Sequence, residues 1–175
     1  APNLEYRGEY FFIKDGQMGG SLYRQPSYSV GLVLTGTSSG LENKKDYEDN
    51  SRLVGLTERD GTLDAGAYFL HKSDAGRLKV TLLSEVTGKH NGQSADVNYV
   101  FDYKLKDWNI NPIVGATWQS ADAVDHFYGV STAEANSNRS AYEGKSAVNL
   151  YAGLRGRYEI NQNWDVSASA AYVHL

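Results

Sequence analysis

The sequence predicts an all-β protein, an antiparallel transmembrane β-barrel, and three observations indicate this fold. Four neighbouring segments alternate apolar and polar side chains for ten or more residues. Tight polar turns lie on one side of the predicted strands and long polar insertions on the other. Tyrosine and tryptophan recur near the expected strand ends. Successive strand residues face opposite sides, and about ten tilted residues cross a bilayer, so each segment can present a lipid-facing and a polar face.

The first half of the chain predicts four strands, two of which alternate less regularly. Leu4–Lys14 carries apolar groups on both faces, and Ser27–Thr37 follows it. Thr62–His71 is also mixed, whereas Arg77–Thr87 alternates cleanly. We interpret Gly19-Gly20 as a turn or strand-edge feature.

The second half predicts four further strands, Ser94–Leu105, Trp108–Gln119, Ala147–Ile160 and Trp164–Val173. Ser94–Leu105 is the clearest of them, because only Val100 interrupts its polar face. Eight strands are therefore visible. Four adjacent segments with the same period favour one continuous sheet.

The connections predict which end of the barrel faces outward. Ser73–Gly76, Lys106-Asp107 and Asn161–Asn163 have the composition of tight hairpin turns. The long insertions Ser38–Gly61 and Ser120–Ser146 fall together on the opposite side, beside a modest loop at 88–93. Outer-membrane barrels have short periplasmic turns and longer external loops, so we expect the insertions to face outward.

Aromatic side chains near the predicted strand ends support the membrane assignment. Rings with an apolar body and a polar tip favour the membrane–water interface, although strands in general also favour tyrosine and tryptophan. The residues concerned are Tyr6, Tyr28, Tyr103, Trp108, Trp118, Tyr158, Trp164 and Tyr172.

Composition excludes several classes of protein. The chain has 175 residues, which predicts a single domain over residues 1–175. A net charge of −4 without a basic stripe argues against nucleic acid as a partner. The absence of cysteine excludes disulfides, zinc-thiolate sites and thiol catalysis. The sequence contains no run of eighteen apolar residues, so we expect no membrane-spanning helix. The residues that follow Ala1 do not have the pattern of a signal peptide, and we expect that such a peptide has been removed.

No catalytic or metal-binding motif emerges, so we expect no enzyme, cofactor or metal. The four histidines do not have metal-ligand spacing. The acidic stretch from Asp46 to Asn50 misses the EF-hand pattern and predicts a solvated loop. Asp122, Asp125 and His126 form a cluster that could contribute to a hydrolase triad with residues distant in sequence.

Charged side chains on the predicted inner faces permit two hypotheses. In a narrow barrel such charges interlock as a salt-bridged interior, which we favour. Alternatively they line a small polar passage or ligand cup in which Arg155 and Arg157 attract an anion. The candidate lumen-facing charges are Arg77, Lys79, Glu85, Asp96, Asp102, Arg155, Arg157 and Glu159, with Glu5, Arg7, Glu9 and Lys104 on the same faces.

One loop resembles the MipA/OmpV family of outer-membrane proteins. That family typically shows Tyr-Tyr-Gly-Val-Ser after a strand like 111–118, and the chain has Asp125-His126-Phe127-Tyr128-Gly129-Val130-Ser131, with Phe127 in place of one tyrosine. The resemblance extends over nearly the whole chain. It continues through segments 2–8, 19–23, 133–135, 141–142, 150–158, 163–166 and 171–172.

The resemblance implies a location, an architecture and a role. The location is the outer membrane of a Gram-negative bacterium. The architecture is a barrel of about ten strands, of which this chain lacks an N-terminal and a C-terminal strand. The role is a scaffold in cell-wall metabolism that links a peptidoglycan lytic transglycosylase to a penicillin-binding protein. A partner surface is expected in the periplasmic turns, at Asp74, Asp107, Asn161 and Asn163.

Other classes of function stay open at this point. A small-solute channel or a ligand-binding barrel would use the lumen charges. An outer-membrane enzyme would use Asp125 and His126. A soluble lipocalin-like ligand binder would bury its apolar rows inside the barrel.

Overall fold

The structure is a computed structural model that describes residues 6–14, 16–38, 44–48, 50, 53–161 and 164–174. Nearly all of its regular structure belongs to one antiparallel sheet, in which the strands follow one another in sequence order except that β7 and β8 both pair with β9. The strands are β1 Tyr6–Arg7, β2 Phe11–Lys14, β3 Gln17–Arg24, β4 Tyr28–Thr37, β5 Thr62–Ser73, β6 Gly76–Glu85, β7 Gln93–Phe101, β8 Tyr103–Leu105, β9 Trp108–Gln119, β10 Ala147–Asn161 and β11 Trp164–His174. The helices are α1 Lys44–Glu48 and α2 Ala121–Tyr128.

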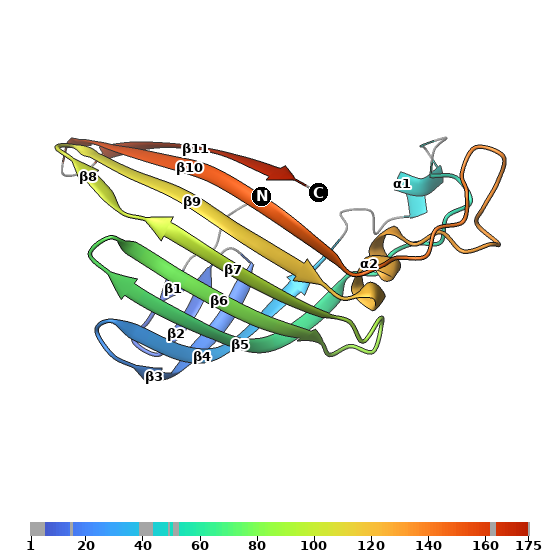
Figure 1. Ribbon diagram of the computed structural model, residues 1–175, viewed down its shortest axis with the longest axis horizontal. Helices are drawn as coiled ribbons and strands as arrows, with labels where there is room; N and C mark the ends of the chain where they lie inside the picture. The colour runs from blue at the N-terminus through green and yellow to red at the C-terminus, as the bar shows by residue number, and fades with distance from the viewer. Residues whose placement is uncertain are drawn as a thin grey trace.

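The sheet curls round on itself. In Figure 1, β1 and β2 lie behind β5 to β7, and β11 lies along the upper edge beside β10. The edge strands are β1 and β11, which do not pair with each other in the described part of the chain. This up-and-down sheet confirms the predicted fold class.

The two ends of the sheet differ, as expected from the connections. Short hairpin turns join β3 to β4, β5 to β6 and β8 to β9 at one end. Both helices and the long connections lie beyond the other end (Figure 1). We call these the short-turn end and the loop end.

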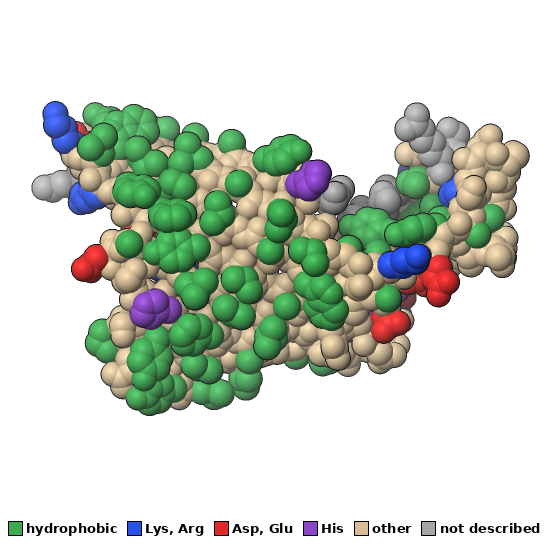
Figure 2. Space-filling model, viewed as in Figure 1, with side chains coloured by type: hydrophobic (Ala, Val, Ile, Leu, Met, Phe, Trp, Pro, Cys, Tyr) green, Lys and Arg blue, Asp and Glu red, His purple; other side chains and the backbone are tan. Residues whose placement is uncertain are grey.

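The outer face of the sheet is apolar. Leu32, Leu82 and Leu150 are each more than half exposed, whereas Thr81 and Asp64, on the inner face of the same sheet, are buried. Figure 2 shows apolar side chains spread over the strands, with Lys, Arg, Asp and Glu gathered at the two ends. The predicted sidedness, with apolar groups outward, is therefore confirmed. Among the described residues, no helix is long and apolar enough to cross a bilayer.

Aromatic pairs lie near the short-turn end. The rings of Trp108 and Tyr158 are 4.9 Å apart, and those of Tyr23 and Tyr28 are 5.8 Å apart. Trp164, in the first position of β11, is 71% exposed. Their position at the strand ends is that of an interfacial aromatic girdle.

The prediction of a single first strand over Leu4–Lys14 is wrong. The described part of that range contains β1 and β2, separated at residues 8–10, and β3 follows instead of an unpaired connection. Gly19 lies inside β3, paired with Phe12 and Val33. A Cβ there would come within 2.6 Å of the Leu32 carbonyl oxygen and the Phe12 ring, so only glycine fits. The Gly19-Gly20 pair is therefore part of a strand and allows close packing. The turn between Lys14 and Gln17 is also short, yet it lies toward the loop end.

Two smaller predictions also need correction. The strand predicted over Ser94–Leu105 is interrupted at Asp102, so that β7 and β8 pair with β9 separately. The acidic stretch expected to be a solvated loop overlaps the short helix α1, which ends at Glu48.

Candidate functional site

The loop carrying the family-like motif begins with helix α2. Ser120 is the N-cap, and its side chain accepts a hydrogen bond from the Ala123 amide. The helix buries Ala123 and Val124 against the end of the sheet and stops at Gly129, whose N–H donates to the Asp125 carbonyl oxygen at 2.8 Å. An N-cap and one apolar face are sufficient to hold so short a helix.

Asp125 anchors the return of this loop. Its Oδ1 accepts a 2.6 Å hydrogen bond from the amide of Gly144. A Cβ on Gly144 would lie 2.3 Å from the Asp125 nitrogen, and one on Gly129 would lie 2.5 Å from Asp125 Oδ1. Both glycines are therefore explained by close packing around Asp125.

Glu134 is a buried charge within the loops of the loop end, only 9% exposed. It pairs with Arg59 at 3.4 Å and accepts hydrogen bonds from the Thr57 amide at 2.6 Å and the Ser131 amide at 2.9 Å. Burial opposes its ionisation, but these hydrogen bonds outweigh burial and hold the pKa of Glu134 well below its usual range. Arg59 also donates to the Gly129 carbonyl oxygen at 2.6 Å. Glu134 thus joins the two long insertions.

The remaining motif residues divide between structure and surface. Val130 exchanges backbone hydrogen bonds with Tyr142 at 2.8 and 2.9 Å. The Ser131 hydroxyl donates to Glu134 at 2.8 Å. Tyr128 is 66% exposed. Of Asp125, Tyr128, Gly129, Val130 and Ser131, the structure brings all but the Tyr128 side chain into the packing of the loop.

Two histidines lie together in this loop assembly. The rings of His90 and His126 are 4.9 Å apart, and Phe127 contacts both. His126 Nε2 lies 3.0 Å from the Asp60 carbonyl oxygen, and the Asp60 carboxylate pairs with Lys89. The hypothesis of an Asp125–His126 catalytic pair gains no support, because the contacts of each are with other groups. We refer to residues 53–61, 86–92 and 120–146 together as the loop cap.

The inner face holds hydrogen-bonded clusters. Asp96 accepts from Thr117 and Tyr151 at 2.9 Å each, and from Asn98 at 2.6 Å. Glu85, at the end of β6, accepts from four residues of the following loop, Thr87, Lys89, His90 and Asn91. Lys79 donates to Gln17 at 3.2 Å. Glu85, Lys79 and Asp96 are therefore engaged within the protein.

The remaining candidate charges that the structure describes lie at the short-turn end, namely Arg77, Asp102, Arg155, Arg157 and Glu159. Glu5 and the side chain of Arg7 lie outside the described part of the chain. Arg77 pairs with Asp102 at 2.9 Å. A polar cavity of about 820 Å³ lies beside this pair. The cavity is lined by Asp102, Tyr103, Lys104, Asn109, Asn111, Arg155, Arg157, Glu159, Asp165, Ser167, Ala168 and Ser169.

The predicted turn contacts lie at the same end. Asp74 and Asp107 are exposed in the two hairpin turns. Asn161 accepts a hydrogen bond from the Trp164 amide at 3.1 Å and closes the β10–β11 turn. Asn163 lies outside the described residues.

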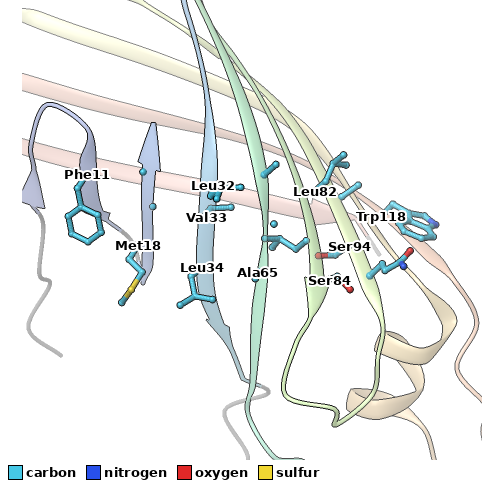
Figure 3. Close-up of a pocket in the computed structure, with 17 residues that line it drawn as sticks. Phe11, Met18, Leu32, Val33, Leu34, Ala65, Leu82, Ser84, Ser94 and Trp118 are labelled. Atoms are coloured by element: carbon cyan, nitrogen blue, oxygen red, sulfur yellow. The ribbon is translucent and has the colours of Figure 1, made fainter. Parts of the chain in front are cut away.

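A second hollow of about 880 Å³ lies on the outer face toward the loop end. Figure 3 shows Met18, Leu34, Ala65, Leu82 and Trp118 among its lining residues, which come from strands β2 to β7 and from β9. Its apolar lining matches hydrocarbon and offers a polar ligand few hydrogen-bond partners.

A curled antiparallel sheet with an apolar exterior, an aromatic girdle and a polar interior defines an outer-membrane β-barrel protein. Residues 1–175, the whole chain, match the family described as MltA-interacting protein MipA, and the chain belongs to this family. The resemblance noted around Tyr128-Gly129-Val130 is thereby confirmed.

Relatives with established names agree with the family. The chain is 26% identical over 175 residues to the MltA-interacting protein of Escherichia coli strain K12, covering 99% of this chain and 70% of that protein. It is 25% identical to the putative outer membrane protein YiaT of the same strain, with the same coverage. It is also 25% identical to the outer membrane protein OmpV of Vibrio cholerae, covering 99% of this chain and 66% of that protein. No solved structure matches the chain. The protein is therefore located in the outer membrane of a Gram-negative bacterium.

Proposed function

We propose that this protein is a non-catalytic scaffold of the outer membrane that binds a lytic transglycosylase of the MltA type. The observation that carries the proposal is family membership over all 175 residues, together with the name MltA-interacting protein of the Escherichia coli relative. By the same family resemblance, a penicillin-binding protein is the second partner, and the complex serves peptidoglycan metabolism. The chain contributes binding, and no bond is broken by it.

The partner would bind at the short-turn end of the barrel, and the position of that end supports the proposal. Outer-membrane barrels place short turns in the periplasm, where enzymes of the cell wall work. Asp74 and Asp107 are exposed there, each on a rigid hairpin of the sheet. The loop cap lies at the opposite end, out of reach of a periplasmic partner. Asn161 and Asn163 complete the proposed contact set.

The test is a pull-down of the MltA-type transglycosylase with charge-reversed turns. The bait is the full chain, refolded in detergent and carrying Asp74→Lys and Asp107→Lys. We expect the double variant to retain about a tenth or less of the bound transglycosylase, because interfacial charges placed against like charges cost affinity. The same bait probed with a penicillin-binding protein tests the second partner separately.

The matched control is Glu58→Lys, an acidic-to-basic change at an exposed position of the loop cap. It should leave binding unchanged. If Glu58→Lys abolished binding and the turn variants did not, the proposed orientation would be reversed. Equal binding by all variants would discard the turn surface.

A further inference from the structure

Rows of polar side chains cross the inner face of the sheet at the short-turn end. The pairing of β9, β10 and β11 sets Asn111, Arg155 and Ser169 side by side in one row. Two residues closer to the turns, the next row contains Lys104, Asn109, Arg157 and Ser167. Both rows line the 820 Å³ cavity. A volume of this size is typical of a small-molecule site.

The carboxylates of this cavity are already engaged. Asp102 pairs with Arg77 and accepts a 2.7 Å hydrogen bond from Asn111. Asp165 pairs with Arg157 at 2.8 Å. Glu159 accepts a hydrogen bond from Asn109 at 3.1 Å. The acidic groups therefore have local partners.

Two cations that line the same cavity have no such partners. Within the described residues, the side chains of Arg155 and Lys104 make no hydrogen bond and no ion pair, although both residues are paired through their backbones in the sheet. Four cations lie in or beside the cavity. Arg77 neutralises Asp102, and Arg157 neutralises Asp165. The two others, Arg155 and Lys104, are left with one remaining carboxylate, Glu159. The local field thus favours an added negative charge.

We infer that this cavity binds the carboxylate or phosphate group of a small polar solute, with Arg155 and Lys104 as its cationic contacts. The guanidinium of Arg155 offers paired N–H donors that match two oxygens of an oxyanion. Ser167 and Ser169 supply hydroxyls for the uncharged part of the solute. The inference does not depend on the scaffold proposal, because the turn residues Asp74 and Asp107 do not line the cavity.

The test is calorimetric titration of the full chain, refolded in a zwitterionic detergent, with three matched sugars. Glucose 6-phosphate and glucuronate carry the two anionic groups, and glucose is the neutral probe. We expect at least one of the anions to bind about tenfold or more tightly than glucose, and added salt to weaken this binding. Binding of one anion alone assigns the site to that group and supports the inference.

Variants decide whether Arg155 is the contact. Arg155→Gln should weaken anion binding about tenfold or more, and Arg155→Lys should restore part of it, because the charge returns without the paired donors. Lys72→Gln removes a charge from an exposed position outside the cavity and should have no effect. Heat-dependent gel mobility confirms that each variant is folded. Equal affinity for glucose and the anions, unchanged affinity in Arg155→Gln, or no binding of any probe would overturn the inference.

Discussion

At the scale of single residues, a buried ion pair connects the two long insertions of the loop cap. Glu134 meets Arg59 from the other long insertion, and both are largely buried, with side-chain exposures of 9% and 16%. A buried ion pair contributes little relative to apolar packing, but removal of one partner leaves an uncompensated charge. This asymmetry makes Glu134 the residue whose loss the cap should tolerate least.

We predict that Glu134→Ala destabilises the loop cap by about 3–5 kcal/mol, the cost of leaving Arg59 unpaired. Limited proteolysis of the refolded protein should show new cleavage within 53–61 and 120–146, while the strands stay resistant. Glu58→Ala, an exposed carboxylate nearby, serves as the control. Equal protection of Glu134→Ala and the unmodified protein would contradict the prediction.

His90 is a second residue with a defined ionisation state. Its Nδ1 accepts a 2.8 Å hydrogen bond from the Gly92 amide, which only the imidazole without a proton on Nδ1 can do. Burial lowers the pKa of His90 below its ordinary value of 6.5, and the neighbouring His126 lowers it further, against the opposing charges of Glu85, Asp64 and Asp122.

We therefore predict that acid loosens the loop cap. A group whose pKa is lower in the folded state contributes its full stabilisation above the unfolded pKa of 6.5, and this is lost as the pH falls through the folded pKa. NMR titration should place the His90 ring below 6.5, with a parallel shift of the Gly92 amide signal. His90→Asn keeps an acceptor at the δ position and should abolish the pH dependence. A His90 midpoint above 6.5 would contradict the prediction.

At the scale of elements, close packing explains what periodicity could not. The sequence predicted β6, β9, β10 and β11 to within a few residues, because their alternation is regular. It missed β3, since Gly19 and Gly20 also fit a turn, and the Phe12 ring that lies over Gly19 comes from another strand. It also predicted an unbroken strand through Asp102, which lies between β7 and β8 and whose carboxylate accepts hydrogen bonds from Arg77 and Asn111.

The packing of Gly144 against helix α2 gives a third prediction. Gly144→Ala should destabilise the α2 region by about 1–3 kcal/mol, because the new Cβ would lie 2.3 Å from the Asp125 backbone nitrogen. Hydrogen exchange at the Val124 and Gly129 amides would measure the local opening. Gly36→Ala is the matched control, since its nearest contact would be at 4.0 Å. Unchanged exchange in Gly144→Ala would show that the loop accommodates the methyl group.

For the whole molecule, the decisive property is that the apolar face points outward. Leu154 lies near the middle of β10 and is 52% exposed on that face. We predict that Leu154→Arg lowers the free energy of unfolding from lipid vesicles by about 2–4 kcal/mol, as expected for a cation on the lipid-facing side of a barrel. Urea titration followed by tryptophan fluorescence would measure it.

The control for this substitution is Leu154→Met, which keeps an apolar side chain of similar volume and should cost less than about 1.5 kcal/mol. An arginine tolerated as well as methionine would mean that this face meets water.

By itself the sequence determined the fold class, the sidedness of the strands, the difference between the two ends and the family, because each depends on local period or on a short contiguous motif. Only the tertiary structure decided that Glu134 reaches Arg59, that Gly144 packs on Asp125, and that Arg155 and Lys104 share one cavity without a carboxylate partner in the described chain. These contacts join residues from different strands and loops. The register of the sheet and the path of the loops decide which of them meet, and alternation within a single strand carries no information about either.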